Sequence, residues 1–212
     1  MTVKDRQRLD DHYSRQARKQ GFPARSVYKL EEIDQRFKLF KPGQRVLDLG
    51  CAPGSWSLYA AARVGERGRV VGLDLTPVKG AFPPQVKTLT ADLLDNNIDL
   101  VAGEAPFDLV LSDMAPKTSG RREVDQSRSL ELCRMAWLWA GQLLHPSGHF
   151  LFKIFQSQEG EEFIKSLQPY FSRINRLKPK ATRSQSLEIF VLGQVFHPDP
   201  AHLSIRLQPE GG

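Results

Sequence analysis

Four ionisable side chains stand where a parallel sheet would bring them to one edge. Lys153 interrupts an apolar stretch, Asp113 closes another, and Glu188 stands near the start of a third. A lone ammonium is costly to bury, so Lys153 needs a carboxylate partner if its strand is central. The alternative is a lysine that reaches solvent from a strand end or an edge strand. With Lys29, from a helical pattern nearer the N-terminus, these residues would form a charge-compensated cluster.

A turn with two glycines provides a second candidate site. Gly50 and Gly54 follow the apolar stretch 45–49 and allow both a tight turn and the close approach of a ligand. Their spacing does not match the Gly-x-Gly-x-x-Gly pattern of dinucleotide sites, and Pro53 removes one amide from any phosphate cradle. A ligand without a pyrophosphate is therefore favoured, and S-adenosyl-L-methionine (SAM) is the obvious candidate.

Three aspartates close successive predicted strands. In nucleotide sites, a carboxylate that binds the ribose hydroxyls follows the glycine turn at a typical distance in the sequence. Asp74 follows this turn at about that distance. Asp92 could receive the adenine amino group, and Asp113 closes the next strand. Each residue alone is a common cap or turn residue. Because the carboxyl ends of parallel strands share one edge, the three together predict a ligand site there.

Alternating strand and helix patterns would position these residues. Apolar stretches predict strands, and apolar residues at three- and four-residue steps predict helices. The predicted strands are 45–49, 69–73, 86–90, 107–111, 149–155, 173–177 and 187–195, and the predicted helices are 24–38, 55–64, 127–144 and 159–171. This α/β order is typical of a mostly parallel sheet with helices on both faces. No helix separates the last two strands, which predicts an antiparallel pair at that edge.

The composition is that of one globular domain. The chain has 212 residues, of which 40% are hydrophobic and 25% charged, and this argues against a disordered chain. No apolar run is long enough to span a membrane, and the first residues lack the apolar core of a signal peptide. Two cysteines exclude a disulfide framework, and the five histidines show no metal-ligand spacing. We therefore expect a cytoplasmic monomer without a metal site and without a membrane partner.

Basic side chains gather in two segments. Residues 1–29 hold eight basic and three acidic side chains, and residues 166–187 hold five basic side chains and no acidic one. The net charge of the whole chain is only +6. Two such segments on a nearly neutral body fit either a nucleic-acid-binding face or two solvated surfaces. We divide the chain into a basic segment 1–22 for RNA binding, a main domain 23–196 and a tail 197–212.

Five sequence motifs resemble those of the FtsJ family of ribose 2′-O-methyltransferases. Cys51 and Ser55 stand where well-known members carry small alanine and glycine, and both side chains are small enough to keep the turn. The motifs run in order between about residue 10 and residue 194: Ala24-Arg25-Ser26-x-Tyr28-Lys29-Leu30, Asp48-Leu49-Gly50-x-Ala52-Pro53-Gly54-x-Trp56, Ser112-Asp113-Met114-Ala115-Pro116, Phe152-Lys153-x-Phe155-Gln156 and Ser186-x-Glu188.

The resemblance implies a Rossmann-like, SAM-dependent methyltransferase fold with a seven-stranded, mostly parallel sheet whose last strand is antiparallel. It implies methyl transfer to a ribose 2′-oxygen of RNA. The family's catalytic set falls on Lys29, Asp113, Lys153 and Glu188, and its SAM contacts fall on Gly54, Trp56, Asp74, Asp92 and Asp113. The chain looks most like members that methylate a uridine of large-subunit (23S) ribosomal RNA within the 50S subunit, with tRNA as the alternative substrate.

Two functions of other classes compete with this interpretation. An NAD-type oxidoreductase could use a similar sheet, but the glycine spacing and the lack of any other nicotinamide signature argue against it. A catalytically inactive RNA-binding protein would keep the basic segments, but all four residues of the catalytic set are present. Measuring whether the protein binds NAD or SAM would distinguish an oxidoreductase from a methyltransferase. Measuring the activity of a Lys153 variant would distinguish an enzyme from an inactive RNA-binding protein.

Overall fold

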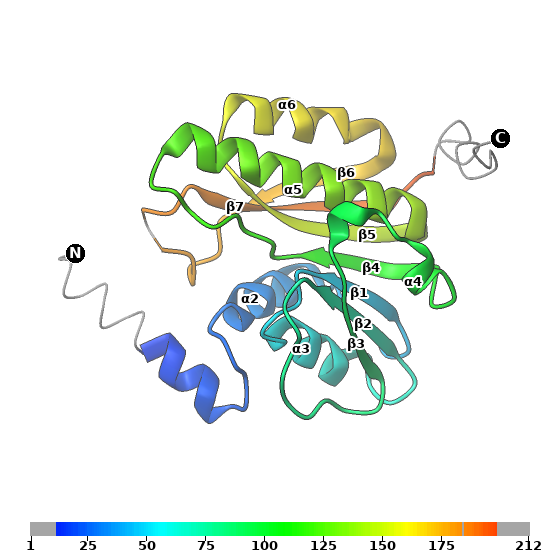
Figure 1. Ribbon diagram of the computed structural model, residues 1–212. Coiled ribbons are helices and arrows are strands. Elements are labelled where there is room, and N and C mark those ends of the chain that lie inside the picture. The colour runs from blue at the N-terminus through cyan, green and yellow to red at the C-terminus, as the bar shows by residue number, and fades with distance from the viewer. Residues whose placement is uncertain (1–11, 184, 199–212) are drawn as a thin grey trace.

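The computed structural model describes residues 12–183 and 185–198. Residues 1–11 of the predicted basic segment and most of the predicted tail therefore lie outside the described residues. Seven strands form one sheet (Figure 1). They are β1 (Arg45–Leu49), β2 (Arg69–Asp74), β3 (Val86–Thr90), β4 (Phe107–Ser112), β5 (Leu144–Phe155), β6 (Phe171–Leu177) and β7 (Glu188–Phe196).

The strands are hydrogen-bonded in the order β3-β2-β1-β4-β5-β7-β6. Strands β1 to β5 pair in parallel, and β7 runs antiparallel to both β5 and β6. The predicted sheet, mostly parallel with an antiparallel last strand, is confirmed. Strand β7 lies between β5 and β6 in the sheet. The edge strand is therefore β6, although β7 follows it in the sequence.

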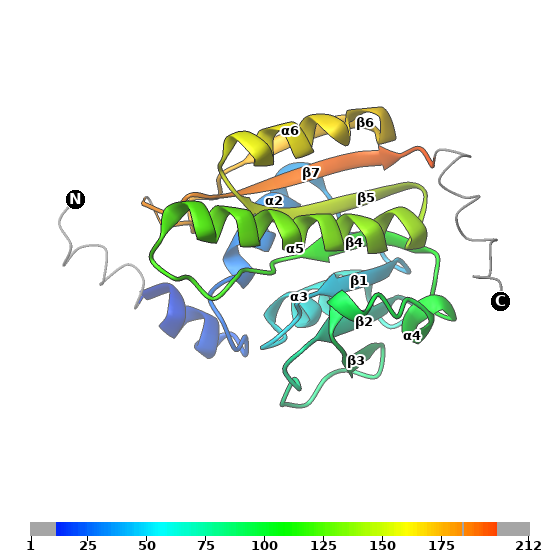
Figure 2. The same ribbon diagram turned by 45° about the horizontal axis from the view of Figure 1, so that its top comes forward.

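Helices cover both faces of the sheet, as predicted. They are α2 (Val27–Phe37), α3 (Ser55–Val64), α4 (Asp99–Ala102), α5 (Arg122–Leu143) and α6 (Gln158–Ser166), with short 3₁₀ turns at Leu93–Asp95 and Gln168–Tyr170. Helices α2 and α3 pack on one face, and α5 and α6 on the other (Figures 1 and 2). Neighbouring β5 residues alternate between two apolar clusters, Leu151 facing α2 and α3 and Phe152 facing α5 and α6. Burial on both faces explains why this strand is apolar almost throughout.

Two predicted boundaries were wrong around the longest helix. Helix α5 begins at Arg122 rather than at residue 127, and the Asp125 carboxylate holds the preceding turn by accepting hydrogen bonds from the amides of Ser119 and Gly120. This first turn is mostly polar and so lacks the apolar periodicity that predicts a helix. Strand β5 begins at Leu144, which pairs with Phe107, rather than at the predicted residue 149.

A third boundary differs at the end of α6. The predicted helix 159–171 ends at Ser166. Pro169 lies in a 3₁₀ turn, where it cannot continue an α-helix, and Phe171 begins β6. The apolar residues of this region therefore belong to two elements that pack into the same cluster.

The described part of the basic segment is helical over residues 12–19. Ala17 is fully buried, and the Tyr13 ring lies 5.5 Å from that of Tyr28 in α2. This part of the segment therefore packs against the main domain (Figure 1). Across the described residues, no helix is both long and apolar enough to cross a membrane.

Candidate active site

A cavity of about 450 Å³ lies at the carboxyl edge of the sheet, at the ends of β1, β2 and β4. Asp74, Asp92 and Asp113 all line it, so the structure brings together the three aspartates singled out at the strand ends. Gly50 and Ala52, from the turn between β1 and α3, line it as well. The cavity therefore joins the glycine turn to the carboxylates.

The parallel register places two of these carboxylates at one level. Leu49, the last residue of β1, pairs with Leu73 of β2 and with Ser112 of β4. Asp74 and Asp113 each follow these partners by one residue. They therefore lie on either side of the turn that begins at the end of β1.

Two of the aspartates also stabilise the loops that carry them. Asp74 Oδ2 accepts a hydrogen bond from the Ala52 amide at 2.9 Å, and its Oδ1 accepts one from the Thr76 amide at 2.7 Å. Asp92 caps a 3₁₀ turn by accepting a hydrogen bond from the Leu94 amide at 2.9 Å. A carboxylate has about four lone-pair positions, so these bonds leave acceptor capacity for a ligand.

Both glycines of the turn are required by its geometry. Gly50 has φ 74° and Gly54 has φ 104°, in the left-handed region that favours glycine. A side chain at Gly50 would collide with Met114, and a Cβ at Gly54 would lie 2.6 Å from Cζ of Phe82. The turn therefore fits closely between the loops that follow β4 and β2. Gly54 lies outside the lining of the cavity.

Trp56 also lies outside the lining of the cavity. Its side chain is buried, its Nε1 donates a hydrogen bond to the Ser26 carbonyl oxygen at 2.9 Å, and its ring lies 5.8 Å from that of Phe190. In this structure Trp56 joins α3 to the start of α2 and to β7. The cofactor contacts predicted for Gly54 and Trp56 stay predictions.

Lys153 is buried in β5 and is paired as its burial requires. Only 6% of its side chain is exposed. Its Nζ donates hydrogen bonds to Oδ1 of Asp113 at 2.8 Å and to the Asp113 carbonyl oxygen at 2.7 Å. Because β5 lies between β4 and β7, the alternative of an edge-strand lysine that faces solvent is wrong. Asp113 therefore borders the cavity and fixes Lys153 at the same time.

A second ion pair lies next to the first. Lys29 of α2 pairs with Glu188, the first residue of β7, and both side chains are largely buried. Lys29 Nζ lies 5.6 Å from the centroid of the Phe190 ring, and Phe190 is the β7 partner of Lys153. Phe190 thus lies beside Lys29 and opposite Lys153, and the four charged residues form two separate pairs. Among the described residues, no ion pair connects one pair to the other.

Asp48 is an ionisable group that the sequence analysis did not assign to the site. It is 1% exposed in β1, its Oδ2 accepts a hydrogen bond from the Ser57 hydroxyl at 2.6 Å, and its Oδ1 has no partner among the described residues. Burial, and to a lesser extent the charges of Asp113 and Asp74, raises the pKa of Asp48 to about 7. The signal was the one used for Lys153, namely a charge that interrupts an apolar strand.

Apolar side chains form the rest of the cavity lining, and the sequence did not assign them to the site. They are Leu75, Leu93, Leu94, Ala115, Met114, Leu132 and Met135. Leu75 and Leu94 are 69% and 60% exposed. Exposed leucines beside carboxylates are suited to enclosing a flat ring whose polar edge is hydrogen-bonded. Their position directly after Asp74, and shortly after Asp92, is the sequence signal that could have found them.

The arrangement combines two chemical capacities. The cavity offers carboxylate acceptors and apolar walls to an elongated ligand, and beside it Lys153 offers a buried amino group that can hold or take up a proton. Within 12–183 and 185–198, no three His, Cys, Asp or Glu side chains lie close enough to share a metal ion.

Comparisons with known proteins point to one protein family. Residues 22–196 match the family model of FtsJ-like methyltransferases. Two similar curated proteins, each called ribosomal RNA large subunit methyltransferase E, come from Bdellovibrio bacteriovorus and Sorangium cellulosum. The first is 49% identical over 187 residues, covering 86% of this chain and 95% of that protein. The second is 48% identical over 183 residues, covering 86% of each.

A solved structure shares the fold. A Plasmodium falciparum protein, assigned as a ribosomal RNA methyltransferase, superposes with a TM-score of 0.71 at 22% identity. The superposition covers 83% of this chain and 99% of that one. At this level of identity the likeness concerns the fold alone.

Proposed function

This chain belongs to the FtsJ-like methyltransferase family, and from this we propose that it methylates the 2′-oxygen of a ribose in large-subunit ribosomal RNA. The observation that carries the proposal is the buried Lys153–Asp113 pair, because it holds an amino group next to the ligand cavity. The relatives called ribosomal RNA large subunit methyltransferase E favour ribosomal RNA over tRNA. We propose a uridine of 23S RNA in the 50S subunit as the target.

SAM is the proposed methyl donor, and when bound it supplies a methyl group activated on a sulfonium. The cavity residues fit its parts, since Asp74 suits the ribose hydroxyls, Asp92 the adenine amino group and Asp113 the methionine ammonium. Leu75 and Leu94 would enclose the adenine ring. The cavity volume of about 450 Å³ lies within the usual range of small-molecule sites, roughly 300–1,000 Å³.

Lys153 is the residue proposed to act on the 2′-oxygen. A ribose hydroxyl is a weak acid at neutral pH, so the enzyme must align it with the methyl group and favour loss of its proton. Two hydrogen bonds to Asp113 use two of the three positions around Nζ, which leaves one for the 2′-oxygen. A neutral Lys153 would take the proton, whereas a charged Lys153 would stabilise the developing alkoxide.

The Lys29–Glu188 pair is proposed to position the ribose. Glu188 lies diagonally across the β5–β7 ladder from Lys153, so its carboxylate is on the same face of the sheet. A carboxylate there can accept a hydrogen bond from a ribose hydroxyl, and the ion pair with Lys29 holds that carboxylate in place.

The basic segments are proposed to bind the phosphates of the RNA. Arg173, Lys178 and Lys180 are exposed on and after the edge strand β6. Arg176 is partly neutralised by its ion pair with Glu161. Phosphate binding by such side chains predicts an affinity that falls steeply as salt rises. We further propose that the protein acts in the cytoplasm as a monomer.

One experiment tests the function directly. The purified protein is incubated with SAM carrying a labelled methyl group and with 50S subunits from cells that lack this protein, and 2′-O-methylated positions are mapped by their resistance to alkaline cleavage. We expect label at a single uridine of 23S RNA. Label on a base, or label on added tRNA but not on 23S RNA, would contradict the proposal. Tight binding of NAD without binding of SAM would overturn the methyltransferase assignment itself.

A further inference from the structure

A second cavity, of about 320 Å³, lies on the other side of the glycine turn. Ala52 lines the first cavity and the next residue, Pro53, lines the second. The second cavity is bounded by the end of the N-terminal helical segment and by the loop between β2 and β3. None of the residues assigned above to SAM or to the catalytic set lines it.

The lining combines two aromatic rings with two cations. Phe22 and Phe82 are partly exposed, and Arg18 and Lys79 are exposed. No acidic residue belongs to the lining. Among the described residues, Lys79 forms no ion pair. Aromatic faces beside unneutralised cations are the combination with which proteins hold unpaired nucleotides, because the base stacks on a ring and the cation meets the phosphate.

The walls of the second cavity are fixed to the site already described. The Ala24 amide donates a hydrogen bond to the Ser55 hydroxyl at 2.7 Å, and the Phe22 amide donates one to the Ala17 carbonyl oxygen at 2.9 Å. Phe82 packs against Gly54 of the turn. A ligand in this cavity would therefore be held at a constant position relative to the methyl-donor cavity.

We propose that this cavity binds one unpaired nucleotide of the RNA substrate, at some distance along the strand from the methylated ribose. This inference rests on the proposed function and adds a substrate subsite to it. The base would stack on Phe22 and Phe82, while Arg18 and Lys79 would bind the adjacent phosphates. Charge complementarity selects RNA as the occupant, since a cationic, acid-free lining suits a polyanion.

Variants of the cation and ring positions test the proposal. The probe is a fluorescent, single-stranded oligouridylate, and its affinity is measured by anisotropy at several salt concentrations. Replacing Phe22→Leu should weaken binding about five- to tenfold because the stacking face is lost, and Phe22→Tyr should restore it. The double change Arg18→Ala and Lys79→Ala should weaken binding about tenfold and flatten its salt dependence. Lys165→Ala, an exposed lysine in the last turn of α6, is the matched control and should bind like the wild type.

Two further measurements separate this inference from the proposed function. SAM affinity, measured by calorimetry, should be the same in every variant, and methylation of 50S subunits should show a raised KM with little change in kcat. A 4-thiouridine probe should crosslink to the peptide that contains Phe22 or to the one that contains Phe82. Unchanged RNA affinity in all variants, or crosslinks confined to other peptides, would overturn the subsite while the wild-type enzyme still methylates 23S RNA. A loss of SAM binding together with RNA binding would overturn it as well, because the residues would then be structural.

Discussion

At the carboxyl edge of the sheet each lysine has one carboxylate partner, whereas at the amino edge three cations share a single carboxylate. Lys153 pairs with Asp113 and Lys29 pairs with Glu188, and the two lysine side chains are 6% and 11% exposed. At the opposite edge the carboxylate belongs to Glu104. Cationic and carboxylate side chains therefore form one-to-one pairs at one edge of the sheet and a shared cluster at the other.

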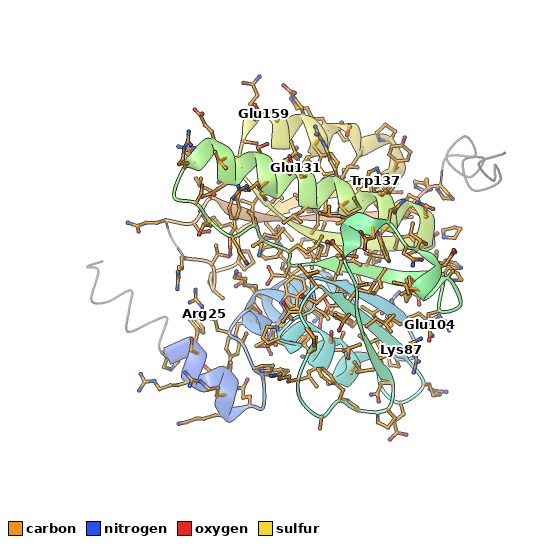
Figure 3. The ribbon with its side chains drawn as sticks, in the orientation of Figure 1. Arg25, Lys87, Glu104, Glu131, Trp137 and Glu159 are labelled. Atoms are coloured by element: carbon orange, nitrogen blue, oxygen red, sulfur yellow. The ribbon has the colours of Figure 1, made fainter. Side chains whose placement is uncertain are left out.

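The amino-edge cluster is open to solvent. Arg45, Arg69 and Lys87 lie 3.4, 3.1 and 3.6 Å from the Glu104 carboxylate, and the cation side chains are between 32% and 41% exposed. Figure 3 shows Lys87 and Glu104 close together on the surface. The hydrogen bond from Arg69, above all, lowers the pKa of Glu104. Water and surplus cations would compensate for the loss of any one of these partners.

The buried pairs at the carboxyl edge lack this compensation by water and additional cations. Removing one member of a buried pair leaves an uncompensated charge, at a cost of about 3–5 kcal/mol, whereas exposed pairs contribute about 0–1 kcal/mol. Replacing a buried pair with apolar residues is often neutral for stability. The burial of the two pairs is therefore not explained by stability alone and fits the catalytic role proposed for them, whereas the exposed cluster is typical of a solvated edge.

The largest effect should come from Lys153. Replacing Lys153→Met should lower methyl transfer by at least ~100-fold, because the 2′-oxygen then loses the group that takes up its proton or stabilises its charge. Initial rates with SAM and 50S subunits measure this change, and calorimetry should show that SAM still binds. Lys87→Met at the amino edge is the matched control and should leave the rate unchanged. Equal rates for Lys153→Met and the wild type would remove Lys153 from the reaction.

Asp48 should make stability depend on pH. Its carboxyl ionises near pH 4 in the unfolded chain and near pH 7 in the folded protein. Between these values the folded protein holds a proton that the unfolded chain has lost, so the free energy of unfolding falls as the pH rises through this window. We expect this group to remove on the order of 2–4 kcal/mol between about pH 4 and about pH 7.

The neutral variant Asp48→Asn isolates that contribution. Urea unfolding of the wild type and the variant at several pH values from about 4 to about 7 should show the gap shifting in favour of the variant as the pH rises. Parallel stability curves would mean that Asp48 ionises normally inside the fold. Asp48 is buried in the same sheet as the two ion pairs but has no cation partner among the described residues, so this result would show how a buried carboxylate behaves without one.

Glu188→Gln should have a smaller effect on the rate, a loss of about tenfold, because the ribose is held less firmly while Lys153 stays in place. Combining it with Lys29→Met removes both charges and should recover stability without recovering the rate. Recovery of both properties in the double variant would show that the pair is structural only. The two readouts are the urea midpoint and the initial rate of methylation.

The smallest effect is expected at the amino edge. Glu104→Gln should lower the free energy of unfolding by less than about 1 kcal/mol, and this difference should shrink further in high salt because exposed charges are screened. The methylation rate should not change. A loss of several kcal/mol would end the distinction between the two edges, since the exposed cluster would then behave like a buried pair.

Most of the fold could be predicted from local patterns. The strand stretches and the helix periodicity place the elements, and the absence of a helix between the last two strands predicts an antiparallel pair. The insertion of β7 between β5 and β6 could not be read locally, because it depends on how three strands share hydrogen bonds. The start of α5 was missed for a related reason, since its polar first turn is held by Asp125 and carries no apolar signal.

The candidate site likewise contains residues that local patterns reveal and contacts that depend on packing between distant elements. Lys153 could be found because a charge within a central strand demands a partner, and Asp113 because it closes a strand. The partner of Glu188 depends on how α2 packs against β7, which no spacing in the sequence reveals. The position of Trp56 outside the cavity lining likewise follows from packing between α3 and β7.

The place of β7 in the sheet has a consequence for biosynthesis. A ribosome makes this strand after the other elements described here, yet it separates β5 from β6 and carries Glu188. A nascent chain halted before residue 188 would have β6 without a neighbour and Lys29 without its counter-ion. Completion of the described sheet and assembly of the four-residue cluster therefore coincide at this strand.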